Sequence, residues 1–341
     1  MSIDDISDQF SHRPRSEEYV DVDKFDLDKR RFLKYITLVR DRRFTSERQV
    51  SIFDVIHDGT YGYANEYAFL QTVDDIGTFD FAISEGQGFI RFYPVDDKVA
   101  YNDFNVSYVA YKIEDSFVGI GTSAFGDIAV IQTSSTKLNT VGTGVTVVSI
   151  GSTYNSVSVM FSINPDNGSQ NEEFNYTQMN FVHNGVDVVT GGEVTNLSTD
   201  LGFLDTSVGY GTFWPYLANN NLVVEFIPNA GIGTTAVINT IQIGIAQTST
   251  SGIATYNMNH IRIQAESTTI ASSASPGITT VNKYRYIDNS EEFHASKYWV
   301  HVADKTNNEH EFIELVALDT INAVGVNSEA FLTEYGNVRT S

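Results

Sequence analysis

The sequence contains no cysteine among its 341 residues. This absence excludes disulfide bonds, zinc sites with thiolate ligands and cysteine nucleophiles. A small secreted scaffold that depends on disulfide bonds is therefore excluded as well. With 341 residues the chain is instead long enough for two or three domains, each of which can bury its own hydrophobic core.

Long apolar runs are also missing from the sequence. No run approaches the roughly 20 apolar residues that a membrane-spanning helix requires. The chain begins with the acidic and polar segment MSIDDISDQF, whereas a signal peptide begins with basic residues and continues with an apolar stretch. We therefore expect a soluble protein that has no signal peptide and does not insert into a membrane.

Basic residues are scarce beyond the N-terminal region. The formal net charge is −22, and residues 1–48 hold 11 of the 21 Lys and Arg residues together with 11 acidic residues. The remaining 293 residues hold 10 basic and 32 acidic residues. Because an acidic surface repels phosphate groups, we do not expect nucleic acid as a partner. The charge is typical of a solvated surface that keeps the protein soluble.

The sequence repeats several short patterns in the same order. Lys34-Tyr35 with Val39 and Asp41 recurs, at identical offsets, as Lys297-Tyr298 with Val302 and Asp304. Three further patterns recur once each. His57-Asp58-Gly59 recurs as His183-Asn184-Gly185, and the stretch from Gly77-Thr78-Phe79 to Pro94 recurs as the stretch from Gly211-Thr212-Phe213 to Pro228. The stretch from Glu66-Tyr67-Ala68 to Thr72 recurs as the stretch from Glu334-Tyr335-Gly336 to Thr340, and here the second copy is one residue longer. Order and spacing together indicate a tandem array of one structural unit.

Runs rich in Val, Ile, Thr, Tyr and Phe predict β-strands, because they alternate apolar and polar residues and are bounded by Gly, Asn, Asp and Ser. Examples are YITLV, VSIFDVI, YAFLQTV, FDFAI, FIRFY and VSYVAYKI. No run shows helical periodicity beyond one or two turns. We therefore predict an all-β protein built from tandem antiparallel β-sandwich or barrel-like domains, with an extended N-terminal arm in front of them.

The repeat spacing predicts where the domains begin and end. We expect an arm at residues 1–33, one β-domain at 34–155, a second at 156–295 and a partial third at 296–341. A period of about 120 to 140 residues is the size of a domain, so we expect separate units strung along the chain. The third copy lacks the Gly-Thr-Phe pattern and the closing strand. Another chain could complete it, although continuation of the natural polypeptide past Ser341 is the favoured expectation.

Sequence patterns that carry chemistry are weak. Residues 231–236 match a dinucleotide fingerprint by letter, but the stretch that follows is β-branched and predicts a strand, whereas the fingerprint requires a helix. The acidic pairs Asp74-Asp75 and Asp96-Asp97 and the polar run 166–172 are typical of turns rather than of a glycosidase pair or a calcium loop. A serine-hydrolase elbow, a phosphate-binding loop and a zinc-protease motif are all missing. We predict no enzymatic activity, no catalytic residues, no metal site and no cofactor.

Histidines and aromatic residues leave alternatives open. His294, His301 and His310 lie close together in the sequence and could form a metal cluster, although scattered surface histidines are the more common case. His57 and His183 occupy equivalent repeat positions, which favours a role in turns or packing. Aromatic side chains either pack in the core or stack on sugar rings. The candidates for glycan contact are Tyr61, Tyr63, Trp214, Tyr216 and Trp299.

The ordered set of patterns resembles the repeated domains in virion structural proteins of marine T4-like phages, such as those of cyanobacteria. The first copy, residues 34–113, matches best. The second copy keeps the Gly-Thr-Phe stretch and Phe226-Ile227-Pro228, with about eight additional residues between its His183 turn and that stretch. The third copy matches only the first half. The resemblance implies a virion localisation and a structural role, and it implies no catalytic residues.

Two functions from different classes follow as hypotheses. In the first, the protein is a structural component of a tailed phage whose arm docks on the neck, baseplate or another tail protein, while the β-domains form a fibre-like, homo-oligomeric appendage. In the second, it is a carbohydrate-binding adhesin that recognises host surface glycans. The candidate docking residues are Arg13, Arg15, Arg30 and Arg31.

Overall fold

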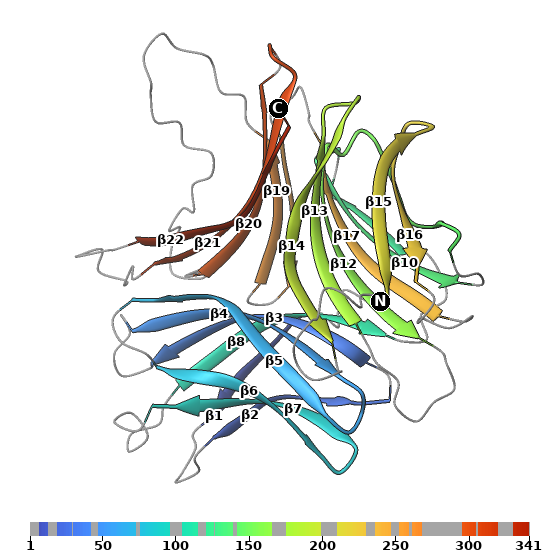
Figure 1. Ribbon diagram of the computed structural model, residues 1–341. Helices are drawn as coiled ribbons and strands as arrows, with labels where there is room; N and C mark the ends of the chain where they lie inside the picture. The colour runs from blue at the N-terminus through green and yellow to red at the C-terminus, as the bar shows by residue number, and fades with distance from the viewer. Residues whose placement is uncertain are drawn as a thin grey trace.

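The computed structural model (Figure 1) contains strands and turns, and it contains no helix among the residues that it describes. This confirms the all-β prediction. The described residues are 7–12, 19–28, 30–41, 47–72, 76–95, 104–114, 121–125, 127–138, 142–165, 175–198, 210–229, 236–246, 252–258, 261–267, 295–304, 306–319 and 330–340.

The first unit is a sandwich of two antiparallel sheets. The large sheet has the strand order β1-β8-β3-β4-β5, and the small sheet has the order β2-β7-β6. Leu33, Tyr35 and Val55 of the large sheet pack against Ile90 and Phe92 of the small sheet and form the core. The strands are β1 (Ser7–His12), β2 (Val20–Asp26), β3 (Arg30–Asp41), β4 (Arg48–His57), β5 (Gly62–Gln71), β6 (Gly77–Ser84), β7 (Gln87–Pro94) and β8 (Phe104–Glu114).

The second unit is a sandwich of the same design. Its large sheet has the order β14-β13-β12-β17-β10-β9, and its small sheet has the order β11-β16-β15. Val159 and Phe161 of the large sheet pack against Val224 and Phe226 of the small sheet. The strands are β9 (Gly121–Phe125), β10 (Ala129–Leu138), β11 (Val145–Gly151), β12 (Ser156–Pro165), β13 (Asn175–His183), β14 (Val188–Ser198), β15 (Gly211–Ala218), β16 (Asn221–Pro228) and β17 (Ala236–Ile245).

The two sandwiches correspond strand for strand. The order β1-β8-β3-β4-β5 becomes β10-β17-β12-β13-β14, and β2-β7-β6 becomes β11-β16-β15. Strand β9 is an additional edge strand of the second sandwich. The turns correspond too, because Glu85-Gly86 and Asn219-Asn220 connect equivalent strands and all four residues have positive φ. The sequence repeat is therefore a repeat of the complete sandwich topology.

The third unit is described as a hairpin, β18 (Gly252–Met258) with β19 (Ile261–Ser267), and a sheet of β20 (Ala295–Asp304), β21 (Glu309–Asp319) and β22 (Ala330–Arg339). This "third sheet" corresponds to β3-β4-β5. The hydroxyl of Thr72 accepts a hydrogen bond from the backbone N–H of Arg48. At the equivalent position of the third sheet, the hydroxyl of Thr340 accepts a hydrogen bond from the backbone N–H of His310. The alignment of Lys34 with Lys297 follows from the same register.

The structure places the edges of the sandwiches differently from the predicted boundaries. Strand β2, at residues 20–26, pairs with β7, and Val22, Phe25 and Leu27 are buried in the first core. Strands β10 and β11, before residue 156, belong to the second sandwich. Residues 20–33 looked like part of a polar arm because only one face of β2 is apolar, while Asp21 and Lys24 on the other face are exposed.

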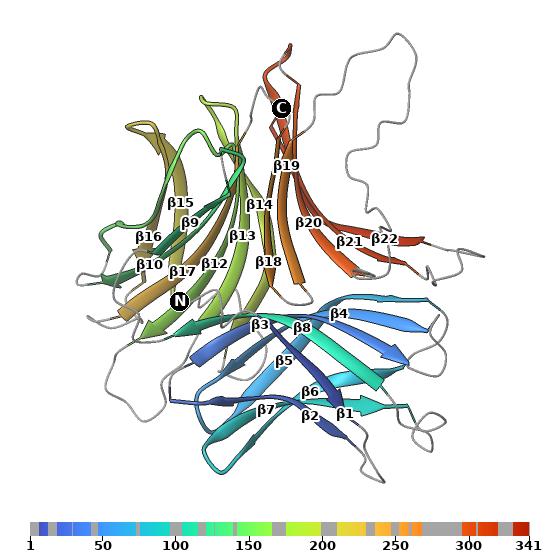
Figure 2. The same ribbon diagram turned by 180° about the vertical axis from the view of Figure 1, so that it is seen from behind.

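The three units pack together and are not strung out along the chain (Figures 1 and 2). The face of each large sheet that points away from its small sheet is called here its outer face. Outer faces of the two large sheets meet at Phe32, Ile56 and Met160, and the third sheet contacts the first through Val316 and the second through Phe312. We call this meeting place the junction.

Candidate functional surfaces

The predicted docking arginines do not form one surface in the structure. Arg13 and Arg15 lie outside the described residues. Arg30 and Arg31 begin β3, are half-buried, and belong to the first sandwich rather than to an arm. The backbone carbonyl of Arg30 also accepts a hydrogen bond from the ring of His57, so this segment is held by the sandwich itself.

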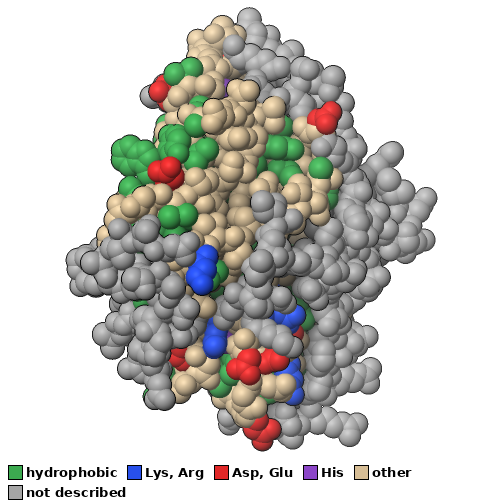
Figure 3. Space-filling model, turned by 90° about the vertical axis from the view of Figure 1, so that its right-hand side faces the viewer, with side chains coloured by type: hydrophobic (Ala, Val, Ile, Leu, Met, Phe, Trp, Pro, Cys, Tyr) green, Lys and Arg blue, Asp and Glu red, His purple; other side chains and the backbone are tan. Residues whose placement is uncertain are grey.

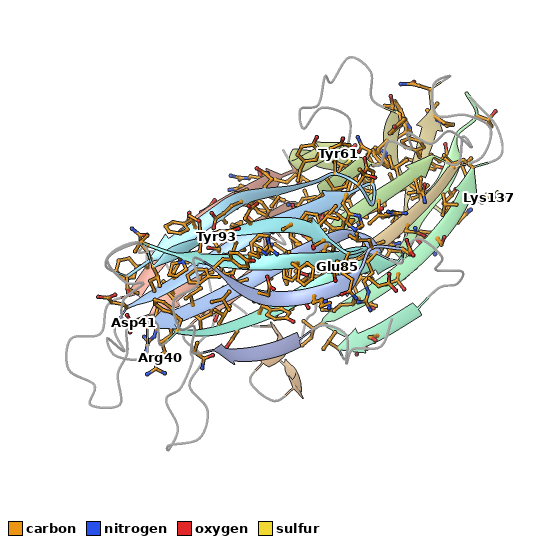
Figure 4. The ribbon with its side chains drawn as sticks, turned by 90° about the horizontal axis from the view of Figure 1, so that it is seen from below. Arg40, Asp41, Tyr61, Glu85, Tyr93 and Lys137 are labelled. Atoms are coloured by element: carbon orange, nitrogen blue, oxygen red, sulfur yellow. The ribbon has the colours of Figure 1, made fainter. Side chains whose placement is uncertain are left out.

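The predicted glycan-contact aromatics are scattered as well. Tyr61 is 67% exposed in the loop between β4 and β5, well away from the end of β3 that Arg40 and Asp41 mark in Figure 4. Tyr63 and Trp299 pack against the apolar cluster at the junction. Only Trp214 and Tyr216 come together, because they are two residues apart on β15 and therefore point to the same side of the small sheet.

The outer side of this small sheet combines aromatic rings with one carboxylate. Trp214 is 59% exposed and lies directly across from Glu225 on β16. The hydroxyl of Tyr216 donates a hydrogen bond of 2.7 Å to Glu225, and this bond raises the pKa of Tyr216. Figure 3 looks onto the side of the molecule that carries β15 and β16, and it shows hydrophobic side chains over the upper part with a few acidic ones among them, and basic side chains only lower down.

The equivalent side of the first sandwich has different chemistry. Arg91 takes the place of Glu225, forms an ion pair of 2.9 Å with Asp21 and lies over the ring of Tyr19. The hydrogen bond to Asp21 and its charge raise the pKa of Arg91 despite partial burial. The first sandwich thus holds a cation between aromatic rings and a carboxylate, whereas the second places a carboxylate beside Trp214 and Tyr216 without such a cation.

The repeated histidines have a structural role, which confirms the prediction from their equivalent positions. Nε2 of His57 donates to the carbonyl of Arg30, and Nε2 of His183 donates to the carbonyl of Tyr154 at the matching place before β12. Both rings are buried. Burial lowers the pKa of His57 to about 4 and also lowers that of His183, so both are neutral near pH 7.

Two of the three histidines that were considered for a metal cluster lie together. His301 and His310 contact each other, whereas His294 lies outside the described residues. Within the described ranges, no group of three His, Cys, Asp or Glu side chains could hold a metal ion. Asp74-Asp75, Asp96-Asp97 and the run 166–172 also lie outside the described residues. The stretch after the Gly-rich run 231–236 forms strand β17, as predicted.

Buried charges at the junction were missed by the sequence analysis. Lys34 forms an ion pair of 3.0 Å with Asp54, and both side chains are completely buried. Burial lowers the pKa of Lys34 to about 8, although Asp54 counteracts the shift. Lys297 forms a second pair, of 2.8 Å, with buried Glu314. The recurrence of lysine at positions 34 and 297 was the signal that could have revealed these pairs.

The second sandwich contributes neutral polar groups to the same network. The Gln178 and Asn180 side chains each donate a hydrogen bond to Glu314, at 3.0 and 2.8 Å. Gln178 also donates to Ser158, which stands where the first sandwich has Lys34. The first and third units thus supply ion pairs, and the second supplies amide donors.

One face of the third sheet, called here its uncovered face, has no second sheet packed on it among the residues that the structure describes. Along β21 the residues alternate between buried and half-buried, and the buried ones point to the junction. On the opposite face Val302 is 42% exposed and Leu332 is 64% exposed. In both sandwiches the equivalent face is covered by a small sheet.

Comparison of the chain with protein-family models, curated proteins and solved structures gives no match. Over the described ranges, no helix has the length and apolar character needed to cross a membrane.

Proposed function

We propose that the protein is a non-enzymatic structural component of a tailed-phage particle, localised to the virion and attached to the neck, baseplate or tail. The observation that carries the proposal is that three copies of one sheet pack through their outer faces into one body. The residues that recur between copies pack, pair charges or close turns, as His57, His183, Lys34 and Lys297 do. A body held together in this way is suited to incorporation into a larger particle.

Homo-oligomerisation is part of this proposal, and the uncovered face of the third sheet supports it. An exposed apolar sheet face favours association, since burying it removes apolar surface from water. The variant Val302→Asp should therefore lower the oligomeric state measured by sedimentation. Val186→Asp is the matched control, because Val186 is 77% exposed in the loop between β13 and β14. Equal sedimentation of both variants and the parent would contradict association through the third sheet.

The structure sharpens the test of particle attachment. Removing residues 1–33 would delete β2 and the start of β3, so the first sandwich would be damaged. Removing residues 1–18 would still delete the edge strand β1, which pairs with β8. Charge reversal at both arginines, Arg13→Glu with Arg15→Glu, leaves β1 and β2 in the chain. We expect the double variant to remain folded by circular dichroism but to be missing from purified particles. Normal incorporation would contradict docking through this segment.

A second candidate function is glycan binding, and the platform of Trp214, Tyr216 and Glu225 favours it. Exposed aromatic rings stack on the apolar faces of sugars, and a neighbouring carboxylate accepts hydrogen bonds from hydroxyl groups. We expect Trp214→Ala to abolish binding on an array of host surface glycans. Tyr61→Ala serves as the control, since Tyr61 is equally exposed but stands alone. An array without signals for the parent protein would rule against this function.

A further inference from the structure

Three histidines lie at the contact between the third sheet and the second sandwich. His301 is on β20, His310 is on β21, and His183 ends β13. The apolar side chains around this contact are Val182, Phe312 and Val338, with Val189, Ile245 and Trp299 at its margin. We call this contact the seam.

Two of the imidazoles are bonded to each other. Nε2 of His301 and Nδ1 of His310 are 3.0 Å apart, and the rings are nearly parallel with 5.2 Å between centroids. A hydrogen bond between two imidazoles needs one N–H donor and one unprotonated nitrogen. If both rings are protonated, the bond is lost and two positive charges face each other. The contact therefore requires that at least one of the two rings is neutral.

In the described part of the chain, no carboxylate pairs with the positive charges that protonation would place on His301 and His310. The nearest charged groups on the junction side of β20 and β21 are Lys297 and Glu314, which pair with each other. Glu309 pairs with Arg339 on the exposed side of the hairpin. On β13 the group that faces the pair is His183, another base.

The direction of the pH effect follows from burial. Burial, with smaller contributions from His310 and His183, lowers the pKa of His301 from 6.5 to about 4. Burial also lowers the pKa of His310 and of His183. Because the folded form binds protons less well than the opened form, the seam is fully stable above pH 6.5. Its stability is lost as the pH falls from 6.5 toward 4.

We propose that His183, His301 and His310 form an acid-sensitive latch, whose protonation releases the third sheet from the second sandwich while both sandwiches stay folded. The third sheet is the unit that opens because each sandwich has a core of its own between two sheets, whereas the third sheet depends on the outer faces of its neighbours. Elements with few contacts of their own open at the lowest free-energy cost.

The protein carries a natural reporter of this opening. It has two tryptophans, and Trp299 lies edge-on to Tyr111 with 6.5 Å between ring centroids, whereas Trp214 is exposed on the small sheet of the second sandwich. In a Trp214→Phe background the fluorescence therefore reports Trp299 alone. We expect a reversible red shift of the emission on acidification, with a midpoint between pH 6.5 and 4. Constant emission across this range would overturn the latch.

Hydrogen exchange with mass spectrometry separates release from general unfolding. Across the same pH range, after correction for intrinsic exchange rates, exchange should rise in β20, β21 and β22 before it rises in β3, β4, β12 and β13. A simultaneous rise in all of these strands would overturn the proposal, since it would indicate unfolding of the whole molecule.

Histidine variants identify the groups that titrate. His301→Gln with His310→Gln keeps neutral polar side chains at the seam, so the acid-induced shift should disappear. His57→Gln is the control: His57 is buried, as His310 is, but lies in the first sandwich, so the Trp299 shift should remain. If the double variant does not fold, His183→Gln should move the midpoint to lower pH. An unchanged pH profile in the folded histidine variants would contradict the latch.

Discussion

The two complete sandwiches share their strand order but differ in the chemistry of their outer surfaces. Inside, both use alternating apolar residues, and both hold a buried histidine on a backbone carbonyl. At the junction the first sandwich presents Lys34 where the second presents Ser158. The inner faces therefore determine the fold of each sandwich, while the outer faces determine how the copies pack against one another.

The largest effect is expected from the buried ion pair that only the first sandwich has. Lys34→Met removes the ammonium group that neutralises Asp54 in a completely buried place. We expect a loss of about 3 to 5 kcal/mol in the free energy of unfolding. Ser158→Ala at the equivalent position removes a neutral hydrogen bond from Gln178 and should cost about 1 kcal/mol. Urea unfolding of both variants measures the difference.

Replacing both members of the pair provides the control. In Lys34→Met with Asp54→Leu no buried charge remains, and an apolar pair of similar volume can be as stable as the ion pair. We expect most of the lost stability to return. Equal effects of Lys34→Met and Ser158→Ala would show that the two sandwiches do not differ at the junction.

An intermediate effect is expected where the sandwiches are alike. Gly77 and Gly211 begin the repeated Gly-Thr-Phe patterns, and a Cβ atom at either position would collide with a phenylalanine ring, of Phe92 or Phe226, and with a backbone carbonyl. Gly77→Ala and Gly211→Ala should each destabilise the protein by about 1 to 3 kcal/mol, as overpacking does. Thermal unfolding measures the loss. Unchanged stability in only one of the two variants would show that the two glycine positions are not equivalent.

The smallest effect is expected at the repeated turns. Asp58 accepts the backbone N–H groups of Thr60 and Tyr61, and Asn184 accepts those of Val186 and Asp187. Alanine at position 58 or 184 should cost about 1 kcal/mol in each case, since water partly replaces these exposed bonds. Similar losses on urea unfolding would show that the turns are interchangeable, while a loss above that of Gly77→Ala would contradict this order.

The fold was largely predictable from the sequence, because strand alternation and turn residues are local signals. Gly59 and Gly185, for example, have positive φ in the hairpin loops, as their Asp-Gly and Asn-Gly pairs indicate. The unit edges were less predictable, because β2 interrupts its alternation with a bulge between Asp21 and Asp23. The charges on its exposed face then dominated the composition of the segment.

The candidate surfaces were less predictable, because they depend on which face of a strand remains free. The sequence grouped Tyr63 with Trp214, yet Tyr63 packs against the junction and Trp214 is exposed. His183 is more than 100 residues away from His301 in the sequence, so no local pattern could place it at the seam. Such contacts depend on how the units pack against one another, and the periodic pattern within a single strand carries no information about that packing.

The covalent connection of the three units has a consequence for how the assembly responds to dilution. At the junction the partners belong to one polypeptide, so their effective concentration is set by the connecting chain and not by the amount of protein. Association through the uncovered face of the third sheet involves separate molecules and obeys mass action. A dilution series therefore tests the proposed oligomer: the junction should persist on dilution, whereas association through the third sheet should be lost.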